Sequence, residues 1–155
     1  MIWTQGYDCK TELVSLFSAS WRTRGLNIKL MKRIINTSSA PAAIGPYSQA
    51  VEINGTLYIS GQLPINPAVG KIEAEDITGQ TQQVLANIGA ILKEAGYTYE
   101  DVVKCTVFMA DLADFVGMNE EYKKVYVDNC PARSTFAVKA LPMGALVEIE
   151  TVAVK

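Results

Sequence analysis

Val51-Glu-Ile-Asn54-Gly55-Thr-Leu57-Tyr-Ile59 is the stretch that decides the fold. Apolar and polar residues alternate in two short runs, and Asn54-Gly55 stands between them. Alternation with a period of two is typical of a half-buried strand, and Asn-Gly between two such runs is the strongest short hairpin signal in a sequence. The stretch therefore predicts an antiparallel hairpin.

Glycine and proline mark the segments on both sides of this hairpin. Downstream, Ser60-Gly61-Gln62-Leu63-Pro64 is expected to end the second strand and to leave backbone N–H groups free to face a ligand. An ordinary exit into a loop is an equally weighted alternative, and a second loop is expected at residues 66–75. Upstream, a short strand at Arg33–Asn36 precedes a loop at residues 37–46. Ten residues without periodicity in a compact domain favour a functional loop.

Two helices are expected after the hairpin. Asp76 or Thr78 caps the first helix, whose apolar residues recur with a period of 3.6, and Gly96 ends it. A β-branched strand is expected at Val102–Met109, and Asp111 opens the second helix. One face of that second helix is expected to pack into the core through Phe115, Met118, Tyr122 and Val125.

The C-terminal part predicts two more strands, Arg133–Val138 and Ala145–Val154, with a turn at Pro142-Met-Gly144. The order of elements predicts an α+β fold, a mixed β-sheet of about six strands with two helices packed on one face. Apolar side chains occur at both odd and even positions from Leu146 to Val154, so the face without helices also needs a cover. A homo-oligomer packed around these sheets, with sites between subunits, is the simplest answer.

The composition excludes several classes of function. The 155 residues are 49% hydrophobic and carry 14 − 16 = −2 charges, so no global positive field attracts nucleic acid. The sequence has no histidine, which removes the commonest general base, the Ser-His-Asp arrangement and most catalytic zinc sites. The three cysteines, Cys9, Cys105 and Cys130, are far apart, which favours neither a disulfide framework nor a thiolate metal site. A reducing, cytoplasmic location fits best.

Residues 1–30 differ from the rest of the chain. Their apolar stretch is too short to span a membrane, and the basic residues follow it, the reverse of a secretory signal. Serines and arginines would suit a transit peptide, but Asp8 and Glu12 weaken that interpretation. We expect an N-terminal extension at 1–30, outside the core fold, and one domain at 31–155.

Fixed charges near the apolar C-terminal strands are the candidates for chemistry. Glu148 and Glu150 share a strand face with apolar residues, and burial would raise a carboxyl pKa towards the range that suits proton transfer. Arg133 lies between Pro131 and a strand, where its planar fork could take a carboxylate or a small anion. The plain alternatives are glutamates that face solvent at an edge strand, or an internal salt bridge to a basic residue such as Arg133 or Lys139. Tyr47 follows Gly45-Pro46, and a tyrosine in such a turn more often has a packing role than a catalytic one.

Several separated motifs in order resemble the RidA family. They are Ala42-Ala-Ile-Gly45-Pro46-Tyr47-Ser48-Gln49, Ser60-Gly61-Gln62-Leu63-Pro64, Asn119, Pro131-Ala-Arg133-Ser134 and Glu148-Ile-Glu150, and the likeness covers Met31 to Lys155. The resemblance implies a chorismate mutase-like fold and a homotrimer with a central β-barrel and clefts between subunits. It also implies hydrolysis of 2-enamine and 2-imine acids, such as 2-aminoacrylate and 2-aminocrotonate, to 2-keto acids and ammonia, without a cofactor or metal.

The family's residues map onto this sequence one by one. The resemblance implies that Arg133 binds the substrate carboxylate, that Glu148 orients and activates water, and that Tyr47 is the active-site tyrosine. Substrate contacts are expected from Ser60, Gly61, Asn119 and Thr135, of which Thr135 replaces a cysteine that is frequent in the family. A non-catalytic trimeric protein that binds small carboxylates, in regulation or as a chaperone, is the alternative. A ribonuclease is a third possibility, against which the acidic charge speaks.

Overall fold

The computed structural model describes residues 31–155, which form a mixed α+β fold of one six-stranded sheet, a small two-stranded sheet and two α-helices. The expectation for residues 1–30 lies outside the described residues. The strands are β1 (Arg33–Ile35), β2 (Ala50–Ile53), β3 (Thr56–Gln62), β4 (Ile65–Asn66), β5 (Lys71–Ile72), β6 (Val102–Met109), β7 (Ala132–Ala137) and β8 (Val147–Val154). The helices are α1 (Ile77–Ala95) and α2 (Phe115–Val125), with short 3₁₀ turns at Tyr99–Asp101, Leu112–Asp114 and Pro142–Gly144.

The predicted hairpin is confirmed as β2 and β3. Val51 pairs with Tyr58 and Ile53 with Thr56, so the connection is the two residues Asn54 and Gly55. Both have positive φ, 52° and 72°, as a type I′ turn requires. Sequence and geometry agree here because few residues other than asparagine and glycine adopt this turn without strain.

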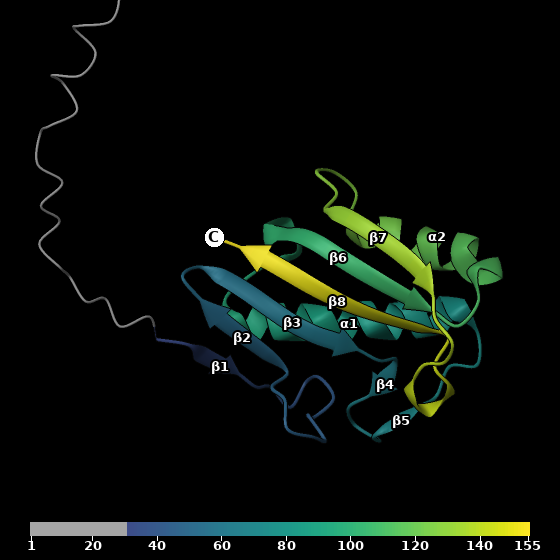
Figure 1. The fold of residues 1–155 in the computed structure, drawn as a ribbon, viewed down its shortest axis with the longest axis horizontal. Helices are drawn as coiled ribbons and strands as arrows, with labels where there is room; N and C mark the ends of the chain where they lie inside the picture. The colour runs from purple at the N-terminus through teal and green to yellow at the C-terminus, as the bar shows by residue number, and fades with distance from the viewer. Residues whose placement is uncertain (1–30) are drawn as a thin grey trace, which may run out of the picture.

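The large sheet has the strand order β1-β2-β3-β8-β6-β7. Only β6 and β7 are parallel, because α2 crosses between them, and all other neighbours are antiparallel. Both helices lie behind the sheet in Figure 1, as predicted, and the face towards the viewer has no helix. We call this second surface the open face.

The core lies between α1 and the helix-facing side of the sheet. Alternate residues of β8, from Val147 to Ala153, are buried against it, and Val84, Ile88 and Ile91 of α1 are fully buried. On the open face, by contrast, Tyr58 and Phe136 each remain about half exposed, at 50% and 54%. Helices therefore cover only one side of the sheet, and apolar side chains are exposed on the other side, as expected.

Three expectations need correction. Residues 66–75 are not a plain loop, because Ile65 and Asn66 pair with Ile72 and Lys71 in a second small hairpin. Asp111 caps a 3₁₀ turn through the N–H of Ala113, and α2 begins only at Phe115. Phe115 is 36% exposed and is not in the buried core, whereas Met118 and Tyr122 are.

Candidate functional site

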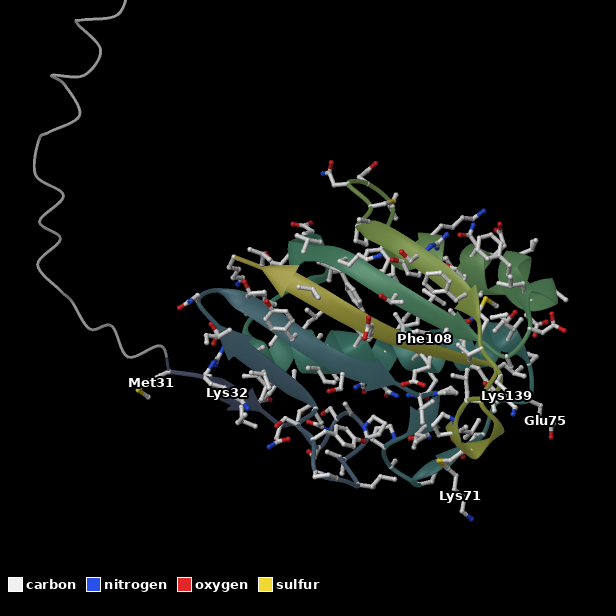
Figure 2. The ribbon with its side chains drawn as sticks, in the orientation of Figure 1. Met31, Lys32, Lys71, Glu75, Phe108 and Lys139 are labelled. Carbon is white, nitrogen blue, oxygen red and sulfur yellow. The ribbon has the colours of Figure 1, made fainter. Side chains whose placement is uncertain are left out.

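Glu148 lies on the open face, near the beginning of β8. It is in β8 opposite Phe108 of β6, which is labelled in Figure 2, and paired residues of neighbouring strands share a face. Partial burial raises the pKa of the Glu148 carboxyl above its ordinary value, and the negative charge of Glu150 raises it further. A carboxylate with a raised pKa beside accessible surface is suited to accept a proton from water.

The backbone of β3 is shaped around this carboxylate. A Cβ at Gly61 would overlap the carboxylate of Glu148, whose Cδ would be only 2.9 Å away. Glycine here lets the Glu148 carboxylate approach the backbone closely, and a larger residue would displace that carboxylate from its present position. This role adds to the expectation that Gly61 contacts substrate, which stays a prediction.

Strand β3 ends within residues 60–64, as predicted, but Ser60 and Gly61 still belong to it. The strand continues to Gln62, and a bulge accommodates both residues, since Ile59 pairs with Thr151 and Gln62 with Ile149. The Ser60 N–H is not free for a ligand, because it donates to the carbonyl of Gln49 at 3.0 Å. Its hydroxyl also donates to the carbonyl of Ser48, at 2.8 Å.

Gln49 orders the first loop, and the sequence analysis missed this function. Its side chain is almost completely buried, and its Nε2 donates to the carbonyls of Thr37, Ala40 and Pro41, at 3.0, 3.2 and 2.7 Å. Its Oε1 accepts from the N–H of Thr37 at 2.7 Å. The available signals were that a glutamine stands three residues after an aperiodic, proline-containing loop and that it ends the first motif of the family resemblance.

Tyr47 stands at the mouth of this loop with 52% of its surface exposed. It lines a small cavity of about 70 Å³ together with Gly61 and other residues, namely Pro41, Ala42, Ile44, Gln49, Gln62, Leu63, Ile65 and Met143. The structure thus brings Tyr47, Ser60, Gly61 and Glu148 to one region around β3, and we call these four residues the acidic half-site.

Arg133 belongs to a different region. Its Nη2 donates to Oδ1 of Asn119 at 2.8 Å, and its guanidinium carbon lies 4.5 Å from the centre of the Tyr122 ring. Thr135 is two residues further along β7 and shares the same face. Arg133, Asn119 and Thr135, the basic half-site, therefore gather beside α2.

The register separates the two half-sites within one chain. Arg133 pairs with Cys105, and Glu148 pairs with Phe108. Because Cys105 and Phe108 are three residues apart on β6, they point to opposite faces, and so do Arg133 and Glu148. The plain alternative, an internal salt bridge, is accordingly absent from residues 31–155, where none of the four ion pairs includes Arg133.

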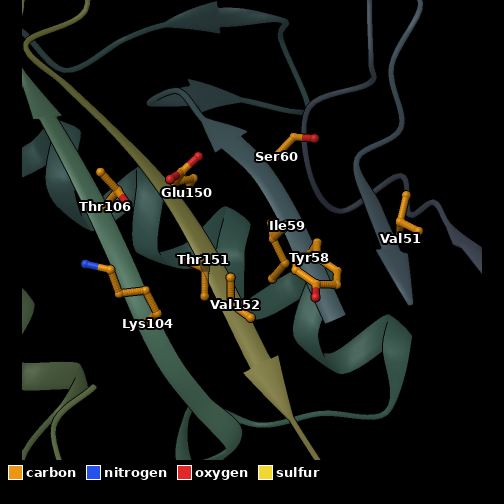
Figure 3. A pocket seen from close by; sticks show the side chains of 9 residues that line it. All are labelled: Val51, Tyr58, Ile59, Ser60, Lys104, Thr106, Glu150, Thr151 and Val152. Carbon is orange, nitrogen blue, oxygen red and sulfur yellow. The ribbon is translucent and has the colours of Figure 1, made fainter. Parts of the chain in front are cut away.

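A wider hollow of about 340 Å³ lies on the open face next to the acidic half-site. In Figure 3, Ser60 of β3, Glu150 of β8 and Thr106 and Lys104 of β6 surround it. The ammonium of Lys104 donates to Oγ of Ser134 at 2.8 Å. Both polar and apolar side chains thus line this hollow.

Among positions 31–155, no three His, Cys, Asp or Glu side chains are grouped so that they could hold a metal ion. No helix in this part of the chain is both long and apolar enough to cross a bilayer.

Comparison with known proteins gives consistent matches over the described domain. The family model described as "Endoribonuclease L-PSP" matches residues 37–155. A goat (Capra hircus) protein named 2-iminobutanoate/2-iminopropanoate deaminase is 50% identical over 126 residues, covering 81% of this chain and 92% of the relative. Reactive Intermediate Deaminase A, chloroplastic, from Arabidopsis thaliana is 45% identical over 155 residues, covering 96% of this chain and 83% of the relative.

Solved structures share the same fold. A putative endoribonuclease from Thermotoga maritima has a TM-score of 0.79 and 46% identity, and the match covers 81% of this chain and 98% of that chain. TdcF of E. coli, solved with bound serine, has a TM-score of 0.76 and 41% identity, with coverage of 79% and 98%.

Proposed function

The chain belongs to the RidA family, the family of the "Endoribonuclease L-PSP" model, and from this membership we propose that it hydrolyses reactive 2-enamine and 2-imine acids to 2-keto acids and ammonia. Its substrates would be small molecules such as 2-aminoacrylate and 2-aminocrotonate. The names of relatives at 45–50% identity support this reaction class. The serine bound to TdcF supports a site for a small amino-acid-like carboxylate.

The observation that carries the proposal is the state of Arg133. Its guanidinium has five N–H donors, and in the described part of the chain it donates to Asn119 and forms no ion pair with a carboxylate. A partly buried cation without a protein anion favours an anionic ligand, and a planar fork suits a carboxylate. The substrates proposed here all carry one.

The opposite orientations of Arg133 and Glu148 support a site that is shared between copies. A single substrate has to reach both groups, and one chain places them on different faces of its sheet. A homotrimer packed through the open faces, with a central β-barrel, would bring the acidic half-site of one subunit to the basic half-site of its neighbour. It would also cover apolar side chains such as Tyr58 and Phe136.

The reaction then needs only positioning and one general base. The substrate carboxylate binds Arg133, and the enamine tautomerises to an imine with an electrophilic C=N carbon. Glu148 accepts a proton from water as the water oxygen bonds to that carbon, and it passes this proton to the imine nitrogen to give a neutral carbinolamine. Glu148 then takes the hydroxyl proton and delivers it to the nitrogen as the C=O bond forms and the C–N bond breaks, which releases ammonia. Such imines also hydrolyse unaided, so general-base catalysis of about 10²- to 10⁴-fold suffices. No cofactor or metal takes part in this scheme.

The test is to generate 2-aminoacrylate in situ and to measure keto acid release. We expect clear acceleration by the wild type and near-complete loss in Arg133→Ala, because the carboxylate has no other fork to bind. The matched control is Arg33→Ala, which removes an arginine paired with Glu52 at the edge of the sheet and should leave the rate unchanged. Equal rates for the wild type, Arg133→Ala and the reaction without enzyme would refute the proposal.

A non-catalytic carboxylate-binding protein is the second candidate, because the same state of Arg133 would suit it. It predicts saturable binding of a 2-keto acid that depends on Arg133, without turnover. The description of the family model raises ribonuclease activity as a third candidate. The net charge of −2 opposes it, and RNA binding that is absent even at low salt would dismiss it.

The cytoplasmic location stays a prediction. The Arabidopsis relative is named chloroplastic, and its match covers 96% of this chain. A transit function of residues 1–30 is therefore the alternative to an extension that only lies outside the core fold.

A further inference from the structure

Three side chains of α2 meet Arg133. Phe115, Asn119 and Tyr122 are spaced i, i+4 and i+7, so they lie on one side of the helix. The guanidinium carbon of Arg133 is 5.6 Å from the centre of the Phe115 ring and 4.5 Å from that of Tyr122. A strand from the sheet thus places one arginine against an aromatic surface of the adjacent helix.

The ring of Tyr122, rather than its hydroxyl, makes this contact. Tyr122 is 4% exposed, and its hydroxyl has no hydrogen-bond partner among the described residues. A guanidinium over an aromatic ring within about 6 Å is attracted to the negative face of the ring. Arginine is well suited to such stacking because its charge is planar and weakly hydrated.

Phe115 supplies the second wall. It occupies an apolar position of α2 but remains 36% exposed, whereas Met118 in the next turn is fully buried. The Phe115 ring is therefore only partly packed against the protein, and Arg133 is one of its contacts. The carboxamide of Asn119 holds one N–H of the same guanidinium at 2.8 Å.

We propose that Tyr122 and Phe115 are positioning residues that fix the plane of the Arg133 guanidinium, while Asn119 fixes its rotation within that plane. The remaining N–H donors then point outward as a preformed fork for the substrate carboxylate. This inference rests on the proposed function, since it concerns how Arg133 binds that carboxylate. Preorganisation of this kind saves the entropy of ordering a long side chain when the ligand binds.

The test measures the Kd of 2-oxobutanoate, a stable 2-keto acid, by calorimetry on the full chain. Tyr122→Leu removes the ring and should raise Kd by about 2- to 13-fold, the change that corresponds to the ~0.5–1.5 kcal/mol cost of ordering one long side chain when the ligand binds. Phe115→Leu, at the longer distance, should raise Kd by a smaller factor. Phe115 is partly exposed, so this second variant tests the inference even where Tyr122→Leu folds poorly.

Two variants separate positioning from a general loss of structure. Tyr122→Phe keeps the ring and removes only the unpartnered hydroxyl, so it should bind 2-oxobutanoate like the wild type. Tyr97→Leu removes another buried tyrosine that has a cation near its ring, Lys155 at 5.1 Å, and should leave Kd unchanged. In turnover, Tyr122→Leu should raise KM while kcat stays within about threefold, whereas a smaller folded fraction would lower kcat alone.

The double variant Arg133→Ala/Tyr122→Leu completes the cycle. Once the guanidinium is absent, removal of the ring should have no further effect on Kd. Equal Kd values for the wild type, Tyr122→Leu and Phe115→Leu would overturn the inference, as would an undiminished effect of Tyr122→Leu in the Arg133→Ala background. If instead Arg133→Ala binds 2-oxobutanoate as the wild type does, the proposed role of Arg133 itself fails, so the two failures are distinguishable.

Discussion

Glu148 and Glu150 are two residues apart on β8 and face the same side of the sheet, yet their surroundings differ. Glu148 is partly buried beside Gly61, whereas Glu150 is exposed at the edge of the hollow that Lys104 also lines. Burial is the larger cause of the raised pKa of Glu148, and the negative charge of Glu150 raises that pKa further. The proton affinity of the proposed base is therefore set by its position and by one neighbour.

This arrangement predicts the pH dependence of the reaction. A raised pKa means that Glu148 loses its basic form at a higher pH than an ordinary carboxyl, so kcat/KM should fall as the pH drops through that raised value. Glu150→Gln removes the neighbouring charge and should move the acidic limb of the pH profile to lower pH. Glu52→Gln, which alters the carboxylate paired with Arg33, serves as the control and should leave the profile in place. A profile that is identical in Glu150→Gln and the wild type would contradict this account.

At the scale of elements, the N-terminus of helix α1 has two candidate capping residues, and the structure distinguishes between them. The sequence left Asp76 and Thr78 as alternative caps. In the structure, Oδ1 of Asp76 accepts the N–H of Gly79 at 2.7 Å, and Thr78 lies inside the helix. At the other end, Gly96 has a φ of 85° and its N–H bonds to the carbonyl of Lys93, as a left-handed C-terminal stop requires.

The cap predicts a difference between two substitutions in the same turn. Asp76→Ala should lower the free energy of unfolding by about 1 kcal/mol, because the N–H of Gly79 loses its acceptor. Thr78→Ala should change it by less than ~0.5 kcal/mol, since it removes no cap. Urea denaturation of both variants measures the difference. If Thr78→Ala lowered the free energy of unfolding more than Asp76→Ala did, Asp76 would not be the cap.

At the scale of the whole molecule, helices cover one face of the sheet and the other is the open face. Arg133 and Glu148 point to opposite faces of this sheet. A site that needs both is then incomplete in a single copy. The proposed homotrimer would complete it, with each site taking Arg133 from one subunit and Glu148 from its neighbour.

This sharing predicts complementation between inactive variants. Arg133→Ala and Glu148→Ala should each be inactive alone. After they are unfolded together and refolded as a one-to-one mixture, about a quarter of the sites should contain both native residues, and about a quarter of the wild-type activity should return. Refolding each variant alone is the control and should restore no activity. A mixture that remains inactive, although sedimentation shows mixed oligomers, would place both residues in one subunit.

The sequence by itself determined the elements whose signals are local. The Asn54-Gly55 turn, the stripe of α1 and the strand at Val102–Met109 were predicted correctly, because a turn needs particular φ angles and a helix or strand has its own period. Pairing between β4 and β5 was missed, since two residues are too short to show a period.

Tertiary structure decided how the candidate residues are grouped. The bulge at Ser60-Gly61, the approach of Glu148 to Gly61 and the aromatic contacts of Arg133 all join segments that are far apart in the chain. Residue types identified Arg133 and Glu148 as candidates, but they could not show that the two point to opposite faces. That orientation follows from the register of β6 with β7 and β8, which packing of the whole sheet selects and no single strand encodes.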